Sequence, residues 1–187
     1  MEYELFTTEN FKTTTWSGGT TTELYLEPAG RSYAERDFTF RLSSATVDDE
    51  VSTFTALPGV RRVITPLDSP LEIKHGSEAG ITLQPFELYH FDGGVKTTSR
   101  GKTRDFNVMY REGQSVSARV LTKGTKLTLP AGKERYFIFS YRGNQFRLGG
   151  DVIAAPTFSL TKFKNNNEAI TLHLDEGEPV ILVSLSA

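Results

Sequence analysis

The feature that most constrains the fold is a series of short segments in which apolar and polar residues alternate. Between residues 37 and 44 the apolar Phe38, Phe40 and Leu42 alternate with polar neighbours, and a period of two is typical of a half-buried strand. Similar segments recur along the chain between Gly, Pro and Asp turns, and none has the 3.6-residue period and caps of a long helix. Strands spaced this regularly predict an all-β sandwich or barrel. The polar residues from Lys96 to Arg104 are predicted to form a loop.

A weak internal repeat suggests how these strands are organised. Arg62-Val63-Ile64 is followed by Leu71-Glu72-Ile73, and Arg135-Tyr136-Phe137 is followed by Phe146-Arg147-Leu148. The offsets are 135 − 62 = 73 and 146 − 71 = 75 residues. Two related β-lobes in tandem would produce this pattern, with an N-terminal lobe over roughly residues 1–110 and a C-terminal lobe over roughly residues 111–187. A chance likeness between two hairpins would produce it too.

Composition excludes several classes of partner. The formal net charge is −2 and the sequence contains no basic block, so neither nucleic acid nor an anionic membrane is an expected partner. The sequence has no apolar run near 18 residues and no apolar N-terminal leader, so we expect no membrane span and a cytoplasmic protein. The absence of cysteine excludes disulfides and thiol chemistry. The oligomeric state stays open between monomer and homodimer.

Metal and nucleophilic chemistry find little support. The three histidines, His75, His90 and His173, lie too far apart in sequence for one strand or helix to present two of them. We therefore expect no metal and no cofactor. The sequence also lacks a Gly-x-Ser-x-Gly elbow, a P-loop and a Gly-x-Gly-x-x-Gly motif, so no catalytic residue is predicted.

The segment Asp105–Tyr110 is the most unusual strand. Phe106, Val108 and Tyr110 share one face, which places Asp105 and Asn107 on the other. Both residues are poor strand formers. They indicate either a hydrogen-bonding wall in a pocket or a strand edge that faces solvent.

Other polar residues could complete such a pocket. Arg41 lies on the polar face of an aromatic strand, where its guanidinium could bind a carboxylate through two parallel hydrogen bonds. Arg61 and Arg62 have opposite strand parity, so only one can point inward. Glu23 could orient an arginine, and Trp16 could form a wall. The ordinary alternatives are a solvated arginine and a core tryptophan.

These stretches resemble the HutD/Ves family. Four motifs occur in the family's order and cover roughly residues 10–115. They are Trp16–Glu23 (WSGGTTTE), Phe38–Val47 (FTFRLSSATV), Phe54–Arg62 (FTALPGVRR) and Asp105–Met109 (DFNVM) with the following Arg111 and Gly113. Two departures stand out, since many relatives have Trp-x-Asn-Gly in the first motif and Asp at the position of Arg61.

The resemblance implies a cupin-like, metal-free bicupin associated with histidine utilisation that binds N-formylglutamate or a similar acid. Carried onto the matching positions, it implies a ligand-binding set that consists of Trp16, Thr21, Glu23, Arg41, Ser43, Arg62, Asp105 and Asn107. We therefore predict a small acidic metabolite as the ligand. A metal-independent hydrolase or isomerase, and a structural or partner-binding β-module, are the alternatives.

Overall fold

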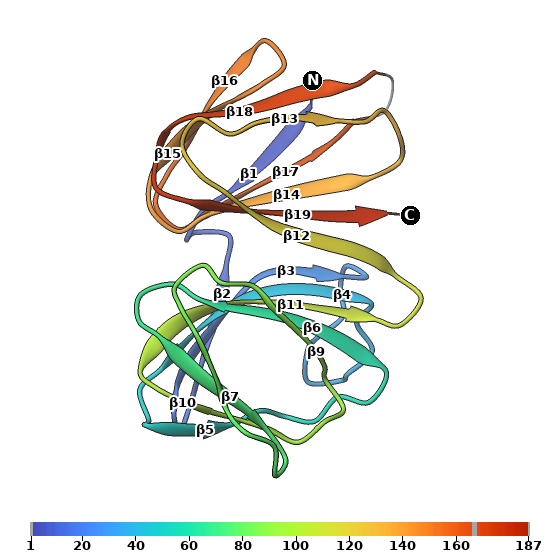
Figure 1. The fold of residues 1–187 in the computed structure, drawn as a ribbon. Helices are drawn as coiled ribbons and strands as arrows, with labels where there is room; N and C mark the ends of the chain where they lie inside the picture. Colours follow the sequence, from blue (N-terminus) through green and yellow to red (C-terminus); the bar gives the residue numbers. More distant parts are fainter. Residues whose placement is uncertain (1, 166–167, 187) are drawn as a thin grey trace. The chain divides into compact units, whose positions relative to one another are not determined.

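The computed structural model describes residues 2–165 and 168–186, and all regular structure in these residues is β-strand. This confirms the all-β class (Figure 1). The described segments contain no helix long and apolar enough to cross a membrane.

The chain divides into two compact units. Residues 11–113 form one, here called the N-terminal unit. Residues 1–10 and 114–187 form the other, here called the C-terminal unit. The first ten residues therefore depart from the expectation that they belong to the N-terminal lobe, because strand β1 (Tyr3–Phe6) pairs with β17 (Ser159–Lys164).

The N-terminal unit contains two antiparallel sheets (Figure 1). The six-stranded sheet has the order β2 (Lys12–Trp16), β3 (Gly19–Glu27), β4 (Phe40–Val47), β11 (Thr103–Arg111), β6 (Val60–Pro66) and β9 (Tyr89–Asp92). The four-stranded sheet has the order β5 (Val51–Thr53), β10 (Thr97–Arg100), β7 (Leu71–His75) and β8 (Ile81–Leu83). Strand β10 lies within the stretch that was predicted to be a loop, so that prediction was wrong.

The C-terminal unit repeats this plan. Its five-stranded sheet has the order β1, β17, β14 (Arg135–Ser140), β19 (Val180–Ser186) and β12 (Ser115–Leu121). Its four-stranded sheet has the order β13 (Lys126–Leu129), β18 (Ile170–Gly177), β15 (Asn144–Leu148) and β16 (Asp151–Ala155).

The two units share one topology. The order β4-β11-β6-β9 in the N-terminal unit corresponds to β12-β19-β14-β17 in the C-terminal unit, and β5-β10-β7-β8 corresponds to β13-β18-β15-β16. The strands that carry the sequence repeat, β6 with β14 and β7 with β15, are therefore equivalent. The predicted offset of 73 residues for the first pair was wrong by one residue, because it matches the inward Arg62 with Arg135 instead of the core residue Tyr136.

The interiors of the two units differ. An apolar core in the C-terminal unit includes Tyr136, Phe146, Phe163, Leu174 and Leu182. In the N-terminal unit the buried apolar residues form separate clusters, one around Ile64, Ile73 and Phe91 and another around Phe38 and Met109. Burying such side chains contributes about 1.5–3 kcal/mol each.

Candidate ligand-binding site

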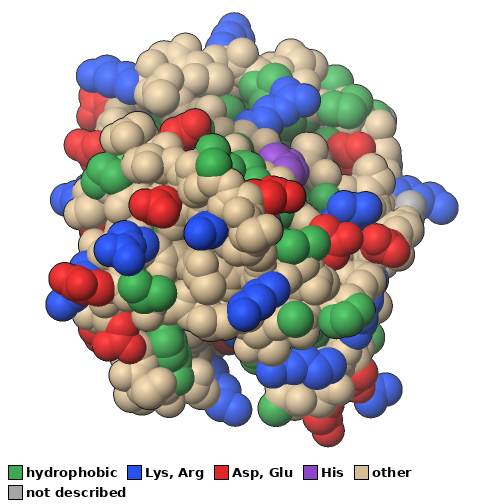
Figure 2. Space-filling model, turned by 60° about the horizontal axis from the view of Figure 1, so that its bottom comes forward, with side chains coloured by type: hydrophobic (Ala, Val, Ile, Leu, Met, Phe, Trp, Pro, Cys, Tyr) green, Lys and Arg blue, Asp and Glu red, His purple; other side chains and the backbone are tan. Residues whose placement is uncertain are grey.

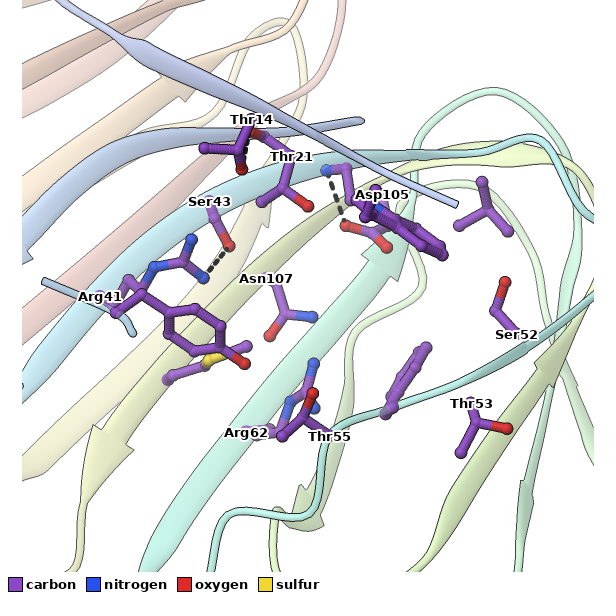
Figure 3. A pocket seen from close by; sticks show the side chains of 16 residues that line it. Thr14, Thr21, Arg41, Ser43, Ser52, Thr53, Thr55, Arg62, Asp105 and Asn107 are labelled. Atoms are coloured by element: carbon purple, nitrogen blue, oxygen red, sulfur yellow. Dashed lines mark hydrogen bonds between the residues drawn. The ribbon is translucent and has the colours of Figure 1, made fainter. Parts of the chain in front are cut away.

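A cavity of about 340 Å³ lies in the N-terminal unit. Strands β4, β11 and β6 contribute its polar wall, and β5 with the residues that follow it contributes much of the remainder. Figure 3 shows the side chains of Arg41, Ser43, Asp105, Asn107 and Arg62 directed toward this space. The polar face of the central strand therefore lies inside the unit and does not face solvent.

Strand register explains this convergence. Strands β4 and β11 are antiparallel neighbours in which Ser43 pairs with Asn107 and Arg41 with Met109. Directly paired residues project from the same face of a sheet, so the odd-numbered residues of both strands point into the cavity. On the other side of β11, Arg62 pairs with Met109 and joins the same face.

Arg41 is held in place by its neighbours. Its Nε donates to Oε2 of Glu23 over 2.9 Å, and its Nη1 donates to Oγ of Ser43 over 3.1 Å. The guanidinium also lies 4.2 Å from the ring centroid of Tyr33. Because Arg41 is only 4% exposed, the Glu23 carboxylate compensates a charge that would otherwise be costly to bury.

Arg62 is buried without such compensation. It is 5% exposed, its Nε has no hydrogen-bond partner, and it forms no ion pair with any residue in the described ranges. The guanidinium instead lies 4.7 Å from the ring centroid of Phe54 and 5.2 Å from that of Phe91. Burial lowers the pKa of Arg62 to about 10, against the opposing effects of Tyr33 and Asp105. The cavity thus contains a cation that lacks a counter-ion of its own.

Asp105 is a buried carboxyl, and among the described residues only one of its two oxygens accepts a hydrogen bond. It is 4% exposed, and its Oδ1 accepts a hydrogen bond from the Ala45 N–H over 3.2 Å. Burial raises the pKa of Asp105 to about 6, although the Ala45 N–H and the positive charges of Arg62, Arg104 and Arg41 act in the opposite direction. This carboxyl therefore titrates close to neutral pH.

Asn107 and Trp16 complete the polar wall and the rim. Asn107 is buried, and its Oδ1 has no hydrogen-bond partner in the described part of the chain. Trp16 lines the cavity but is 39% exposed. Its ring packs on Gly18, where an added Cβ would lie 2.2 Å from a ring atom, so this turn requires glycine to keep the indole in place.

Two of the three histidines, His75 and His173, are engaged elsewhere. In His75, Nδ1 bonds to the Thr97 hydroxyl over 2.9 Å and Nε2 to the Tyr89 hydroxyl over 3.0 Å. His173 lies in the C-terminal unit, where it contacts Asp175 over 2.9 Å. Within residues 2–165 and 168–186, no group of three or more histidine, aspartate or glutamate side chains is placed to bind a metal ion. The expectation of a metal-free protein stays a prediction.

Seven of the eight predicted site residues line the cavity, and Glu23 is linked to it through Arg41. Sequence reasoning missed the other nine lining residues, which are Thr14, Tyr33, Ala45, Val47, Ser52, Thr53, Phe54, Thr55 and Met109. Met109 shares the parity of Asp105 and Asn107, and Phe54 lies in the motif that ends at Arg62, so both were within reach. Tyr33 lies within a turn-rich segment without periodicity, so its position could not be predicted from the sequence.

The surface gives no competing indication on the side that Figure 2 draws. There, acidic and basic side chains are interspersed and do not gather into a patch of one sign. This agrees with the small net charge of −2 and leaves the cavity as the strongest candidate site.

Comparison with known structures identifies the fold class of the protein. The chain has the fold of bacterial pirin YhhW from Escherichia coli, solved in complex with nickel(II), at 10% identity and a TM-score of 0.70 over 99% of both chains. The protein is thus a two-unit β-protein of the cupin type. The nickel belongs to that neighbour.

The family follows from the sequence. The HutD family model matches residues 8–181, so the chain belongs to the HutD family. HutD from Pseudomonas fluorescens SBW25, solved in a formate condition, is similar at 20% identity and a TM-score of 0.79, over 99% of this chain and 98% of that one. The conserved protein of unknown function PA5104 from Pseudomonas aeruginosa PAO1 aligns over the full length of both chains at 20% identity and a TM-score of 0.85. A comparison with curated proteins finds no match.

Proposed function

We propose that this HutD-family protein binds a small acidic metabolite in the N-terminal cavity, and that Arg62 is the anchor for the ligand's carboxylate. The observation that carries the proposal is the buried guanidinium of Arg62, which has no ion pair in the described structure. A buried charge without a partner costs several kcal/mol. A carboxylate would supply the missing counter-ion and two charge-assisted hydrogen bonds.

The rest of the cavity suits a ligand of this kind. Its volume of about 340 Å³ is near the lower end of the range for small-molecule pockets. The Asn107 amide can donate and accept beside Arg62, while Tyr33, Phe54 and Met109 supply apolar wall. Arg41 is already engaged by Glu23 and Ser43, so it serves better as a rigid wall than as the primary anchor.

N-formylglutamate is our first candidate for the ligand, with modulation of histidine utilisation as the role. It combines carboxylates with a formyl amide, which matches the guanidinium, amide and carboxyl groups around the cavity. Membership of the HutD family and the association of that family with histidine utilisation support the choice.

Calorimetric titration with N-formylglutamate, glutamate and glutarate tests the proposal. Arg62→Ala should weaken binding by about 2–5 kcal/mol, because it leaves the ligand carboxylate buried and unpaired. Arg62→Lys should recover little, since an ammonium cannot reproduce the planar fork. The matched control is Arg61→Ala: Arg61 is the adjacent arginine, its side chain is 50% exposed, and it does not line this cavity.

Equal affinity of wild type and Arg62→Ala for these acids would remove Arg62 from the site. No binding of any of these acids by wild type would reject the function itself and favour a structural or partner-binding module.

One observation favours a second candidate, a metal-independent enzyme that acts on a small carboxylic acid. A carboxyl whose pKa is raised to about 6 is suited to proton transfer near neutral pH. Product analysis after prolonged incubation with each acid that binds would separate a binder from an enzyme. Turnover that is lost in Asp105→Asn would establish the enzyme.

A further inference from the structure

The cavity contains a second charge that the carboxylate anchor does not use. Only Oδ1 of Asp105 accepts a hydrogen bond, from the Ala45 N–H. The carboxyl lines the same cavity as Arg62 but forms no ion pair with it or with any other residue in the described ranges. In Figure 3 the two groups lie on different sides of Asn107, with Asp105 above it and Arg62 below it. The cavity therefore separates a cation from an anion.

The fold itself does not require a carboxyl at this place. Strand β19 of the C-terminal unit is the equivalent of β11, and its inward residues Val180 and Leu182 belong to an apolar core. The same topology thus forms with branched apolar side chains on the central strand. A buried aspartate on β11 costs desolvation energy, which leaves ligand recognition as a reason for its presence.

Counting the charges around the cavity indicates what the ligand must provide. Glu23 compensates Arg41 through a 2.9 Å contact, so Arg62 and Asp105 remain. A carboxylate that binds Arg62 neutralises a positive charge that favours the ionised form of Asp105, and it brings a second anion into the same cavity. A hydrogen-bond donor on the ligand would correct this imbalance.

We infer that Asp105 accepts a hydrogen bond from an N–H group of the ligand, so that the site selects acids carrying an amide or ammonium nitrogen over acids that lack one. The inference rests on the proposed function, because it needs a ligand whose carboxylate binds Arg62. It assigns Asp105 as a specificity-determining residue. A dipolar ligand, with its carboxylate at Arg62 and its N–H at Asp105, leaves neither charge unpaired.

The alternative is that Asp105 is protonated and donates a hydrogen bond to an anionic ligand. Binding through a ligand N–H and binding through a protonated Asp105 should have opposite pH dependence. The charged groups that act on Asp105 are Arg62 from β6 and Arg41 from β4, which line the same cavity, and Arg104, the adjacent residue of its own strand. These arginines stay protonated over the working range. An N–H donor stabilises the ionised carboxyl, so its affinity should fall as the pH drops through about 6. An acid without nitrogen should instead bind more tightly as the pH falls.

The experiment is calorimetric titration of the full chain with N-formylglutamate, N-formyl-N-methylglutamate and glutarate between about pH 5.5 and 8, a window chosen to bracket the pKa of Asp105. The N-methyl compound replaces the N–H donor with a methyl group and keeps both carboxylates and the formyl oxygen. Wild type should prefer N-formylglutamate by about tenfold to a hundredfold, as expected for a hydrogen bond to a charged group. In Asp105→Asn the amide oxygen can keep the Ala45 contact, and its NH₂ then meets the ligand N–H, so the preference should disappear.

Asp92→Asn is the matched control. Asp92 also accepts a backbone N–H through Oδ1, from Gly94, but its side chain is 43% exposed and does not line this cavity. This variant should retain the full preference, and thermal denaturation of all three proteins verifies that they are folded.

The outcomes separate the inference from the function on which it rests. Equal binding of the three acids by wild type would overturn the inference and leave the carboxylate site intact. A preference that survives in Asp105→Asn would also overturn it, by assigning the N–H contact to another group. Failure of all three acids to bind wild type would overturn both.

Discussion

Replacing Arg62 with methionine should stabilise the protein while removing ligand binding. Burial lowers the pKa of Arg62 from its ordinary, more alkaline value to about 10, and each pKa unit corresponds to about 1.4 kcal/mol of difference between the two protonation states. The folded state therefore binds this proton less tightly than the unfolded chain, by about 3 kcal/mol. This destabilisation is fully present below about pH 10 and is relieved only at more alkaline pH, so it acts in full at neutral pH.

The net gain should be smaller than this cost. The contacts of the guanidinium with Phe54 and Phe91 contribute about 0.5–2 kcal/mol, and a methionine side chain recovers part of that through sulfur–aromatic contacts. We expect Arg62→Met to raise the free energy of unfolding by about 1–3 kcal/mol, within the range seen when buried charges are replaced by apolar residues.

Urea denaturation followed by the fluorescence of Trp16, the single tryptophan of the chain, measures this change. Trp16 lies in the N-terminal unit, so its signal reports the unit that contains the substitution. With a slope of about 1–3 kcal/mol per molar urea, the midpoint should rise by about 1 M. Arg61→Met at the exposed neighbouring position should shift stability by less than about 0.5 kcal/mol. An Arg62→Met midpoint below that of wild type, at unchanged slope, would show that the fold needs the guanidinium and would remove the basis of the proposed anchor.

Three further outcomes follow from particular residues. The raised pKa of Asp105, about 6 against 3.8 unfolded, means that the folded state binds this proton more tightly, so stability should decline as the pH rises from about 4 to 6.5; thermal denaturation across this range should show a flatter profile in Asp105→Asn. Gly19→Ala places a Cβ 2.0 Å from the Thr46 carbonyl oxygen at a φ of +148°, whereas the Cβ of Gly76→Ala meets nothing within 4 Å. Unfolding curves should show that Gly76→Ala lowers the free energy of unfolding by about 1 kcal/mol and that Gly19→Ala lowers it by clearly more. Elemental analysis should find no stoichiometric transition metal, and a chelator should leave the melting temperature unchanged; metal bound by two or more histidines would contradict this.

Much of the site could be predicted because strand periodicity acts locally. The alternation in Phe38–Ser44 and in Asp105–Tyr110 determines which side chains share a face, and two adjacent antiparallel strands then bring their polar faces together without any further information. Arg41, Asp105 and Asn107 were found in this way, whereas Ser43 was added by the family resemblance. The role of Arg41 was not, because the pairing of its Nε with Glu23 depends on the position of β3 across the sheet, which a period of two does not reveal.

Other features could not be predicted because the residues that they bury are polar. Strand β10 contains Thr97 and Ser99, both buried, yet a sequence of Thr and Ser has the composition of an exposed loop. Tyr33 reaches the cavity from a segment without regular structure, where no period exists to be read. The repeat failed by one residue for a related reason: a similar tripeptide, Arg-Val-Ile or Arg-Tyr-Phe, can occur in either face register, and only the packing of Tyr136 against Phe163 shows which side is inward.

The two units also provide an internal comparison that bears on function. Equivalent strands carry Leu121, Tyr136 and Leu182 toward the interior of the C-terminal unit, whereas β4, β6 and β11 carry Arg41, Arg62 and Asn107 toward the interior of the N-terminal unit. Since the apolar version forms the same topology and fills its core, the polar version cannot be explained by the needs of the fold. Buried polar groups without partners lower stability. Three buried side chains with an unpartnered atom, Ser52, Arg62 and Asn107, line the cavity, which is expected where a protein gives up stability to recognise a ligand.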